Sequence, residues 1–120
     1  MADPPHDRDR ALLLDIVLSA RDALSFVDGL DASAFANSRL HQNAVIRSLE
    51  VIGEAAGKIS PEMRAVLNEV PWSDITGMRH RLVHDYANVN VDLVWETVRD
   101  RLRPLIERLE PWVADDGESP

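Results

Sequence analysis

The sequence contains no cysteine, so disulfide bonds and thiolate metal sites are excluded. It also lacks any run near the roughly 18 apolar residues that a membrane-spanning helix needs, and no apolar stretch follows its charged N-terminus. Neither a membrane span nor a signal peptide is therefore predicted. A chain that needs no oxidising compartment is expected to be cytoplasmic.

Basic and aromatic residues are also scarce. Lysine and arginine number 13 against 21 aspartates and glutamates, which gives a formal net charge of -8. Nonspecific binding to nucleic acid depends on cations that neutralise phosphates, so this balance opposes it. Aromatic residues make up only 5% of the chain, and no pair of them is placed as a platform for stacking bases. Any phosphate chemistry must therefore be local.

The composition is that of a folded protein. A chain of 120 residues, 45% apolar and 28% charged, predicts one domain spanning residues 1–120. Apolar residues recur at steps of three and four, which is typical of amphipathic helices. The sequence thus predicts an all-α bundle of four main helices plus one short helix. The helices are expected over residues 10–30, 38–59, 61–68, from about 73 into the motif described below, and 91–109, with frayed ends at about 1–8 and 114–120.

A few residues refine this prediction. Ser60 is expected to cap the short helix and Asn90 the last one. Pro104 should kink the last helix, because it lacks a backbone donor and crowds the preceding turn. Gly53 and Gly57 lie one turn apart, where the absence of side chains would let another backbone approach. Close packing there would offset a cost in helix propensity of about 1 kcal/mol each.

The segment GMRHRLVHDY, residues 77–86, concentrates two arginines, two histidines and the only tyrosine of this acidic chain. An arginine fork can bind phosphate oxygens through two hydrogen bonds and offset charge in a transition state. A histidine with an ordinary pKa near ~6.5 can take the proton of a ribose 2′-hydroxyl or give one to a leaving 5′-oxygen. Arg79 and His84 thus supply what RNA cleavage without a metal requires. The alternative is a solvated helix face beside a buried histidine.

The spacing of these two residues raises a geometric problem. Arg79 and His84 are five apart, so on a regular helix they would point roughly 140° away from each other, whereas Arg79 and Tyr86 would share a face. Either the helix distorts or ends near His84, or residues of two subunits complete one site across a two-fold axis. A symmetric dimer would also gather cations locally on an acidic protein.

A metal site is the weaker interpretation of the same segment. His80 and His84 have the spacing at which two helical imidazoles share a metal, but no glutamate follows His80 and no third ligand is identifiable. Aspartates also cluster near the first helix, where they are best explained as its solvated face: Asp9, Asp15, Asp22 and Asp28. No metal and no other cofactor is therefore predicted.

The motif RxxxxHxY, filled by Arg79, His84 and Tyr86, resembles the signature of HEPN-domain ribonucleases, and specifically of the HepT-like toxins. The segments IGEAA, PW..I.GMR and HDY follow that family's order and spacing. The resemblance implies a helical bundle that dimerises, with Arg79 and His84 as the catalytic pair in a cleft at the interface. It also implies metal-independent endoribonuclease activity on cellular RNA, with tRNA among the candidates. His80, Arg81 and Arg47 are further candidates for RNA or phosphate contact.

The same resemblance assigns a role to Tyr86. HepT-like toxins are typically encoded beside a minimal nucleotidyltransferase antitoxin, called MntA, which transfers AMP to this tyrosine; the pair forms a type VII-like toxin–antitoxin system. The adenylyl group would bring bulk and negative charge beside a site meant for phosphate. One departure from the family is His80, where many HEPN sequences have asparagine. The alternative function is a noncatalytic HEPN dimer that binds a nucleotidyltransferase partner or a nucleotide.

Overall fold

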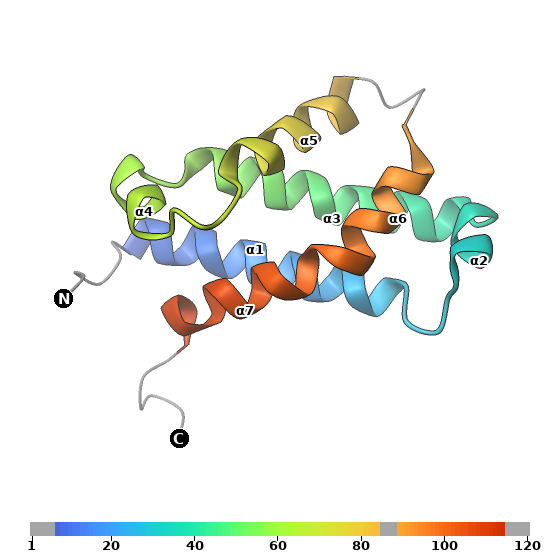
Figure 1. Ribbon diagram of the computed structural model, residues 1–120, viewed down its shortest axis with the longest axis horizontal. Helices are drawn as coiled ribbons and strands as arrows, with labels where there is room; N and C mark the ends of the chain where they lie inside the picture. The colour runs from blue at the N-terminus through green and yellow to red at the C-terminus, as the bar shows by residue number, and fades with distance from the viewer. Residues whose placement is uncertain (1–6, 85–88, 115–120) are drawn as a thin grey trace.

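The computed structural model describes residues 7–84 and 89–114, and in these two ranges the chain is helical with no strand (Figure 1). The prediction of an all-α bundle is confirmed. The helices are α1 (Asp7–Phe26), α2 (Ala32–Ala36), α3 (Arg39–Lys58), α4 (Pro61–Val66), α5 (Trp72–His84), α6 (Val91–Asp100) and α7 (Leu102–Val113).

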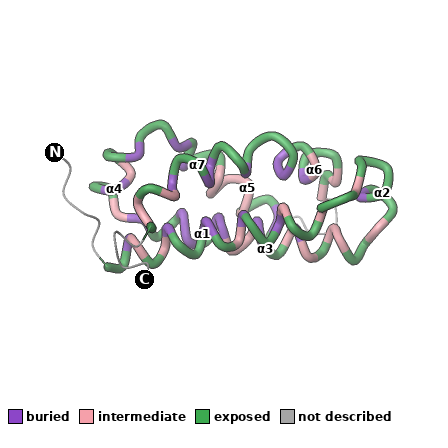
Figure 2. The backbone as a smooth tube through the Cα atoms, turned by 90° about the horizontal axis from the view of Figure 1, so that it is seen from below, coloured by how far each residue is buried: buried purple, intermediate pink, exposed green. Residues whose placement is uncertain are grey.

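The bundle is built around the two longest helices, α1 and α3, which lie side by side and run in opposite directions (Figure 1). Helix α5 packs on α3, and α7 packs on α1, while α6 contacts α2 and α3. The buried residues line the inner faces of these helices (Figure 2). The largest fully buried side chains come from five of the helices: Leu13, Ile16, Val17, Phe35, Val45, Val94, Val98 and Leu109.

Side-chain caps fix where several helices begin. The Ser60 hydroxyl accepts the backbone N–H of Met63, and Pro61 occupies the first turn of α4. The Asn90 side chain likewise accepts the N–H of Leu93 at the start of α6. Each cap satisfies one of the backbone donors that a helix N-terminus leaves unpaired. Both predicted caps are therefore confirmed.

The prediction of one helix over residues 91–109 with a kink at Pro104 is wrong. The chain forms two helices instead, α6 and α7, which are separated at Arg101. Pro104 has no N–H to donate to the carbonyl of Asp100, and its ring crowds that turn. The break at Arg101 places Pro104 in the first turn of α7, where its missing N–H would be unpaired in any case.

Two further differences concern the ends of helices. Helix α1 ends at Phe26, four residues before the predicted end, and Gly29 follows with a left-handed φ of 80° that breaks the helix. The connection then holds α2, which the sequence did not predict, because five residues are too few to show a helical period. The signal for α2 was its cap, Asp31, whose carboxylate accepts the N–H of Ala34.

Asp9 is buried, which corrects the prediction that it belongs to the solvated face of the first helix. Its carboxylate accepts the backbone N–H of Ser60 at 2.9 Å and the hydroxyl of Ser60 at 2.5 Å. The same hydroxyl caps α4. One carboxylate therefore ties the start of α1 to the junction of α3 and α4, 51 residues away in the sequence.

Replacing Asp9 with alanine is expected to lower the free energy of unfolding by about 1.5–3 kcal/mol, because two hydrogen bonds to a buried carboxylate are lost and the Ser60 donors are left unpaired. Urea denaturation followed by circular dichroism measures this. Asp15→Ala is the control, since Asp15 is exposed on the same helix and a surface substitution should change stability by no more than about 0.5 kcal/mol. Equal losses in the two variants would contradict a stabilising role for the Asp9 carboxylate.

Candidate functional site

Helix α5 carries the arginine and histidine motif, and Trp72 fixes where that helix begins. The Trp72 side chain is 7% exposed, and its indole N–H donates to the carbonyl of Leu67 at 3.0 Å. The guanidinium of Arg64 lies 5.9 Å from the centre of the Trp72 ring, close enough for a cation–π interaction. Trp72 thus anchors the N-terminal end of α5 against α4 and the turn that follows it.

Arg79 lies where α5 makes its closest described approach to a glycine of α3. A Cβ atom built on Gly53 would be 2.2 Å from the Cβ of Arg79 and 3.2 Å from the carbonyl oxygen of Ile75. The predicted close approach of another backbone is therefore confirmed at Gly53. At Gly57 a Cβ would meet only a methyl group of Thr76, at an ordinary contact distance of 3.9 Å.

The guanidinium of Arg79 has an unused donor. Its Nε atom is buried, and no hydrogen-bond acceptor for it exists among residues 7–84 and 89–114. The Nε atom of Arg64 is buried without a described acceptor in the same way, so this feature is not specific to Arg79. An arginine fork suits the oxygens of a phosphate or carboxylate. Arg79 thus supplies a group suited to an anion, while its Cβ packs against Gly53 of α3.

The two histidines of the motif lie elsewhere on α5. His80 and His84 are both exposed, and their ring centres are 4.4 Å apart with the ring planes inclined by 45°. The structure thus brings these two imidazoles together, whereas Arg79 packs against α3. The predicted divergence of Arg79 and His84 on a regular helix agrees with these positions.

The remaining residues that were predicted to belong to the site lie on different helices or outside the described residues. Arg81 is exposed and lines a cleft beside α6. Arg47 lies on α3 with its side chain 72% exposed, 3.7 Å from a carboxylate oxygen of Glu50, an arrangement that contributes little to stability. Tyr86, the predicted AMP acceptor, lies outside the described residues. The five predicted residues that the structure describes are therefore not gathered at one place in this chain.

A cleft on the described helices lies apart from Arg79 and the histidines. It encloses about 550 Å³ between α5 on one side and α6 and α7 on the other, with Leu49 and Ile52 of α3 among its lining. Met78 and Arg81 line it, but Arg79, His80 and His84 do not. The cleft is therefore not the place where the predicted catalytic pair would act.

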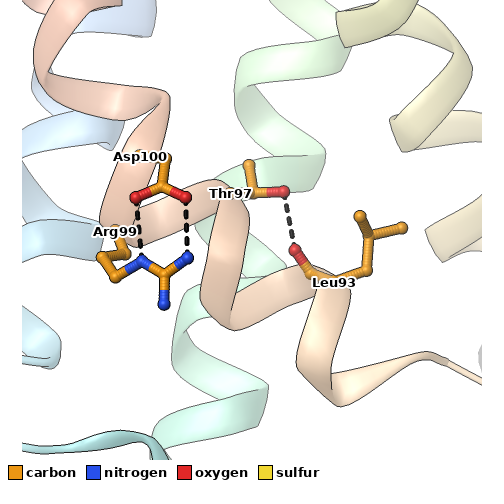
Figure 3. Close-up of polar contacts among 4 residues, drawn as sticks. All are labelled: Leu93, Thr97, Arg99 and Asp100. Atoms are coloured by element: carbon orange, nitrogen blue, oxygen red, sulfur yellow. Dashed lines mark hydrogen bonds and ion pairs between the residues drawn. The ribbon is translucent and has the colours of Figure 1, made fainter.

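Polar contacts of α6 shape one wall of this cleft (Figure 3). The Thr97 hydroxyl donates to the carbonyl of Leu93 at 2.8 Å and lies 3.8 Å from the sulfur of Met78 on α5. Arg99 donates two hydrogen bonds of 2.8 Å to Asp100, and these bonds hold the pKa of the Asp100 carboxyl below its usual value. The charges of Arg99 and Asp100 thus pair with each other, and the Asp100 carboxylate that lines the cleft already has a cationic partner.

In the part of the chain that the structure describes, no three histidine, aspartate or glutamate side chains are grouped as ligands for a metal ion. Over the same two ranges, no helix has the length and apolar character needed to cross a bilayer.

Comparison with known proteins places most of the chain in one family. Residues 16–111 match the family model described as Ribonuclease HepT-like. The chain is 35% identical over 101 residues to "Putative RNase MJ1380" of Methanocaldococcus jannaschii, an alignment that covers 84% of this chain and 93% of that protein. It is 39% identical over 69 residues to "Probable ribonuclease HepT" of Thermococcus cleftensis, covering 58% of this chain and 63% of that protein. No solved structure matches the chain with significance.

Proposed function

Because the chain belongs to the HepT-like ribonuclease family, we propose that it is a metal-independent endoribonuclease of the cytoplasm, the toxin of a type VII-like HepT/MntA toxin–antitoxin system. Its substrate is cellular RNA, with tRNA as the first candidate. The observation that carries this proposal is the match of residues 16–111 to the ribonuclease family model, a range that includes Arg79 and His84. The guanidinium of Arg79 would bind the oxygens of a phosphodiester.

The proposed reaction needs two groups. His84 takes the proton of a ribose 2′-hydroxyl, and the freed oxygen attacks the adjacent phosphorus as the bond to the 5′-oxygen breaks. The departing 5′-oxygen takes up a proton from water, and the protonated His84 returns its proton to the solvent. Arg79 holds the oxygens of the phosphate and offsets the negative charge that builds on them in the transition state. The guanidinium thereby supplies the positive charge that a metal ion provides in other nucleases.

We further propose that the active unit is a homodimer. Arg79 packs against α3 while His84 is exposed to solvent, so one chain alone does not direct both side chains to one phosphate. A two-fold axis that brings two α5 helices together would let the histidine of one subunit complete the site of the other. It would also gather the cations of two motifs on a protein with a net charge of -8.

The regulatory part of the proposal concerns Tyr86, and it rests on the sequence motif. A minimal nucleotidyltransferase of the MntA type is the proposed partner, and it transfers AMP to the phenolic oxygen of Tyr86. The modified residue stands two positions after His84 in the sequence. Its bulk and negative charge would oppose the entry of an RNA phosphate.

Induced expression of the wild type is expected to arrest cell growth, whereas His84→Ala is expected to permit it, because the proposed general base is absent. Growth curves and the intact mass of each purified protein test this. Arrest by both proteins would refute catalysis by His84. Continued growth of cells that express an unmodified, folded wild type would count against the toxin. Continued growth with a protein mass raised by AMP would instead show that the wild type had been modified.

The acidic charge of the chain favours a second candidate, a noncatalytic HEPN dimer that binds a nucleotidyltransferase or a nucleotide. A net charge of -8 suits contact with a protein better than contact with RNA. In such a module, Arg79→Ala and His84→Ala would leave any cellular effect unchanged. The growth experiment therefore separates the two candidates.

A further inference from the structure

We propose that Gly53 is a positioning residue for Arg79: the missing side chain of Gly53 sets how deeply α5 seats on α3 and thereby where the arginine is held. The catalytic meaning of this inference rests on the proposed function of Arg79. The contact between Gly53 and Arg79 does not rest on that function, because it follows from the distances between α3 and α5.

The backbone conformation of Gly53 does not require glycine. Among the glycines in residues 7–84 and 89–114, only Gly29 has a left-handed φ. Gly53 lies inside α3, where glycine is intrinsically less favourable than alanine. Helix propensity therefore favours alanine at this position, and the reason for glycine must be space.

The space is occupied by atoms that cannot move aside. A Cβ on Gly53 would lie 2.2 Å from the Cβ of Arg79, an atom attached directly to the backbone, and 3.2 Å from the carbonyl oxygen of Ile75. No change of side-chain rotamer displaces either atom. Raising the first distance to 3.4 Å, where ordinary contact begins, requires α5 to move by about 1.2 Å relative to α3.

Such a movement would carry Arg79 away from its position. The Cβ and Cγ atoms of Arg79 are the atoms nearest to a Cβ built on Gly53, so lifting α5 away from α3 displaces the whole side chain and the fork that would bind phosphate. A misplacement of about 1 Å in a catalytic group can cost on the order of 100-fold in rate. Gly53 thus acts on the reaction through Arg79 and touches no substrate itself.

The test compares Gly53→Ala with Gly57→Ala, a matched substitution one turn later in α3 whose new methyl would meet only Thr76, at 3.9 Å. Cleavage of purified bulk tRNA is measured over a range of concentrations. Gly53→Ala is expected to lower kcat by about 10- to 100-fold while KM stays within about threefold, because the lost interaction forms in the transition state. Gly57→Ala should keep both constants within about twofold.

A second measurement does not depend on catalysis. The Nε–H signal of Arg79 in a nitrogen–proton NMR spectrum can be assigned by its disappearance in Arg79→Lys. This signal should shift in Gly53→Ala and stay in place in Gly57→Ala. An unshifted signal in Gly53→Ala would overturn the positioning role. A shifted signal together with an unchanged rate of tRNA cleavage would instead overturn catalysis by Arg79, and so the proposed function.

Failure of Gly53→Ala to fold would call for the double variant Gly53→Ala/Arg79→Gly, which removes the Cβ that the new methyl would meet. Recovery of helical circular dichroism in the double variant would establish the contact as the cause of unfolding. A double variant that stays unfolded would overturn the contact.

Discussion

Replacing Arg79 with alanine is expected to lower the rate of RNA cleavage by about 100- to 1,000-fold, the usual cost of removing one group that stabilises charge in a transition state. Alanine keeps the Cβ that meets α3 at Gly53, so the seating of α5 should survive. The unused Nε donor would disappear with the side chain. Cleavage of purified bulk tRNA, with circular dichroism to monitor folding, measures the effect.

Two further variants sharpen this experiment. Arg79→Lys keeps the positive charge but loses the planar fork, so it should remain at least about tenfold below the wild type. Arg103→Ala is the control, since Arg103 is an exposed arginine of α7 outside the motif. A rate for Arg79→Ala equal to that of Arg103→Ala would exclude a catalytic role for Arg79 and favour the noncatalytic module.

The largest effect on stability is expected at Phe35. Its side chain is 0% exposed, and its ring centre lies 5.3 Å from that of Trp95 on α6. Phe35→Ala should lower the free energy of unfolding by about 3–5 kcal/mol, because apolar burial is lost and a cavity remains. Urea denaturation monitored by far-ultraviolet circular dichroism reports the change without relying on the tryptophan signal.

Phe26→Ala provides the comparison for this substitution. Phe26 is 39% exposed at the end of α1, so the same chemical change should cost much less, on the order of 1 kcal/mol. Similar losses in the free energy of unfolding for Phe26→Ala and Phe35→Ala would contradict a core role for the Phe35 side chain. A large difference would support Phe35 as the side chain through which α2 packs against Trp95 of α6.

The sequence predicted the helical class and most of the helices, because those signals are local. Apolar residues at steps of three and four define one face of a helix wherever the chain is long enough to show them. Ser60 and Asn90 were identifiable as caps, since each needs only the backbone N–H three residues ahead. The motif from Arg79 to Tyr86 was equally readable, because it lies within a few turns of one segment.

The features that sequence reasoning missed depend on partners far away in the chain. Asp9 had the appearance of one more surface aspartate, and only the approach of Ser60 made it a buried acceptor. Phe35 lay in a segment too short to show a period, and its burial depends on Trp95. The helix breaks at Arg101 and not at Pro104, where the kink was predicted. The reason is that Pro104 leaves the carbonyl of Asp100, one turn earlier, without its N–H donor.

The sequence by itself therefore determined most of the helices, the caps at Ser60 and Asn90 and the chemical groups that the motif provides, all of which follow from interactions within a few residues. Its glycine pair indicated that some backbone approaches α3, but only the tertiary structure identified Gly53 as the contact and Arg79 as its partner. The tertiary structure also decided that Arg79 seats against α3 while His84 faces solvent. The physical reason is that close packing depends on which helices cross and where, and spacing along one helix does not specify that.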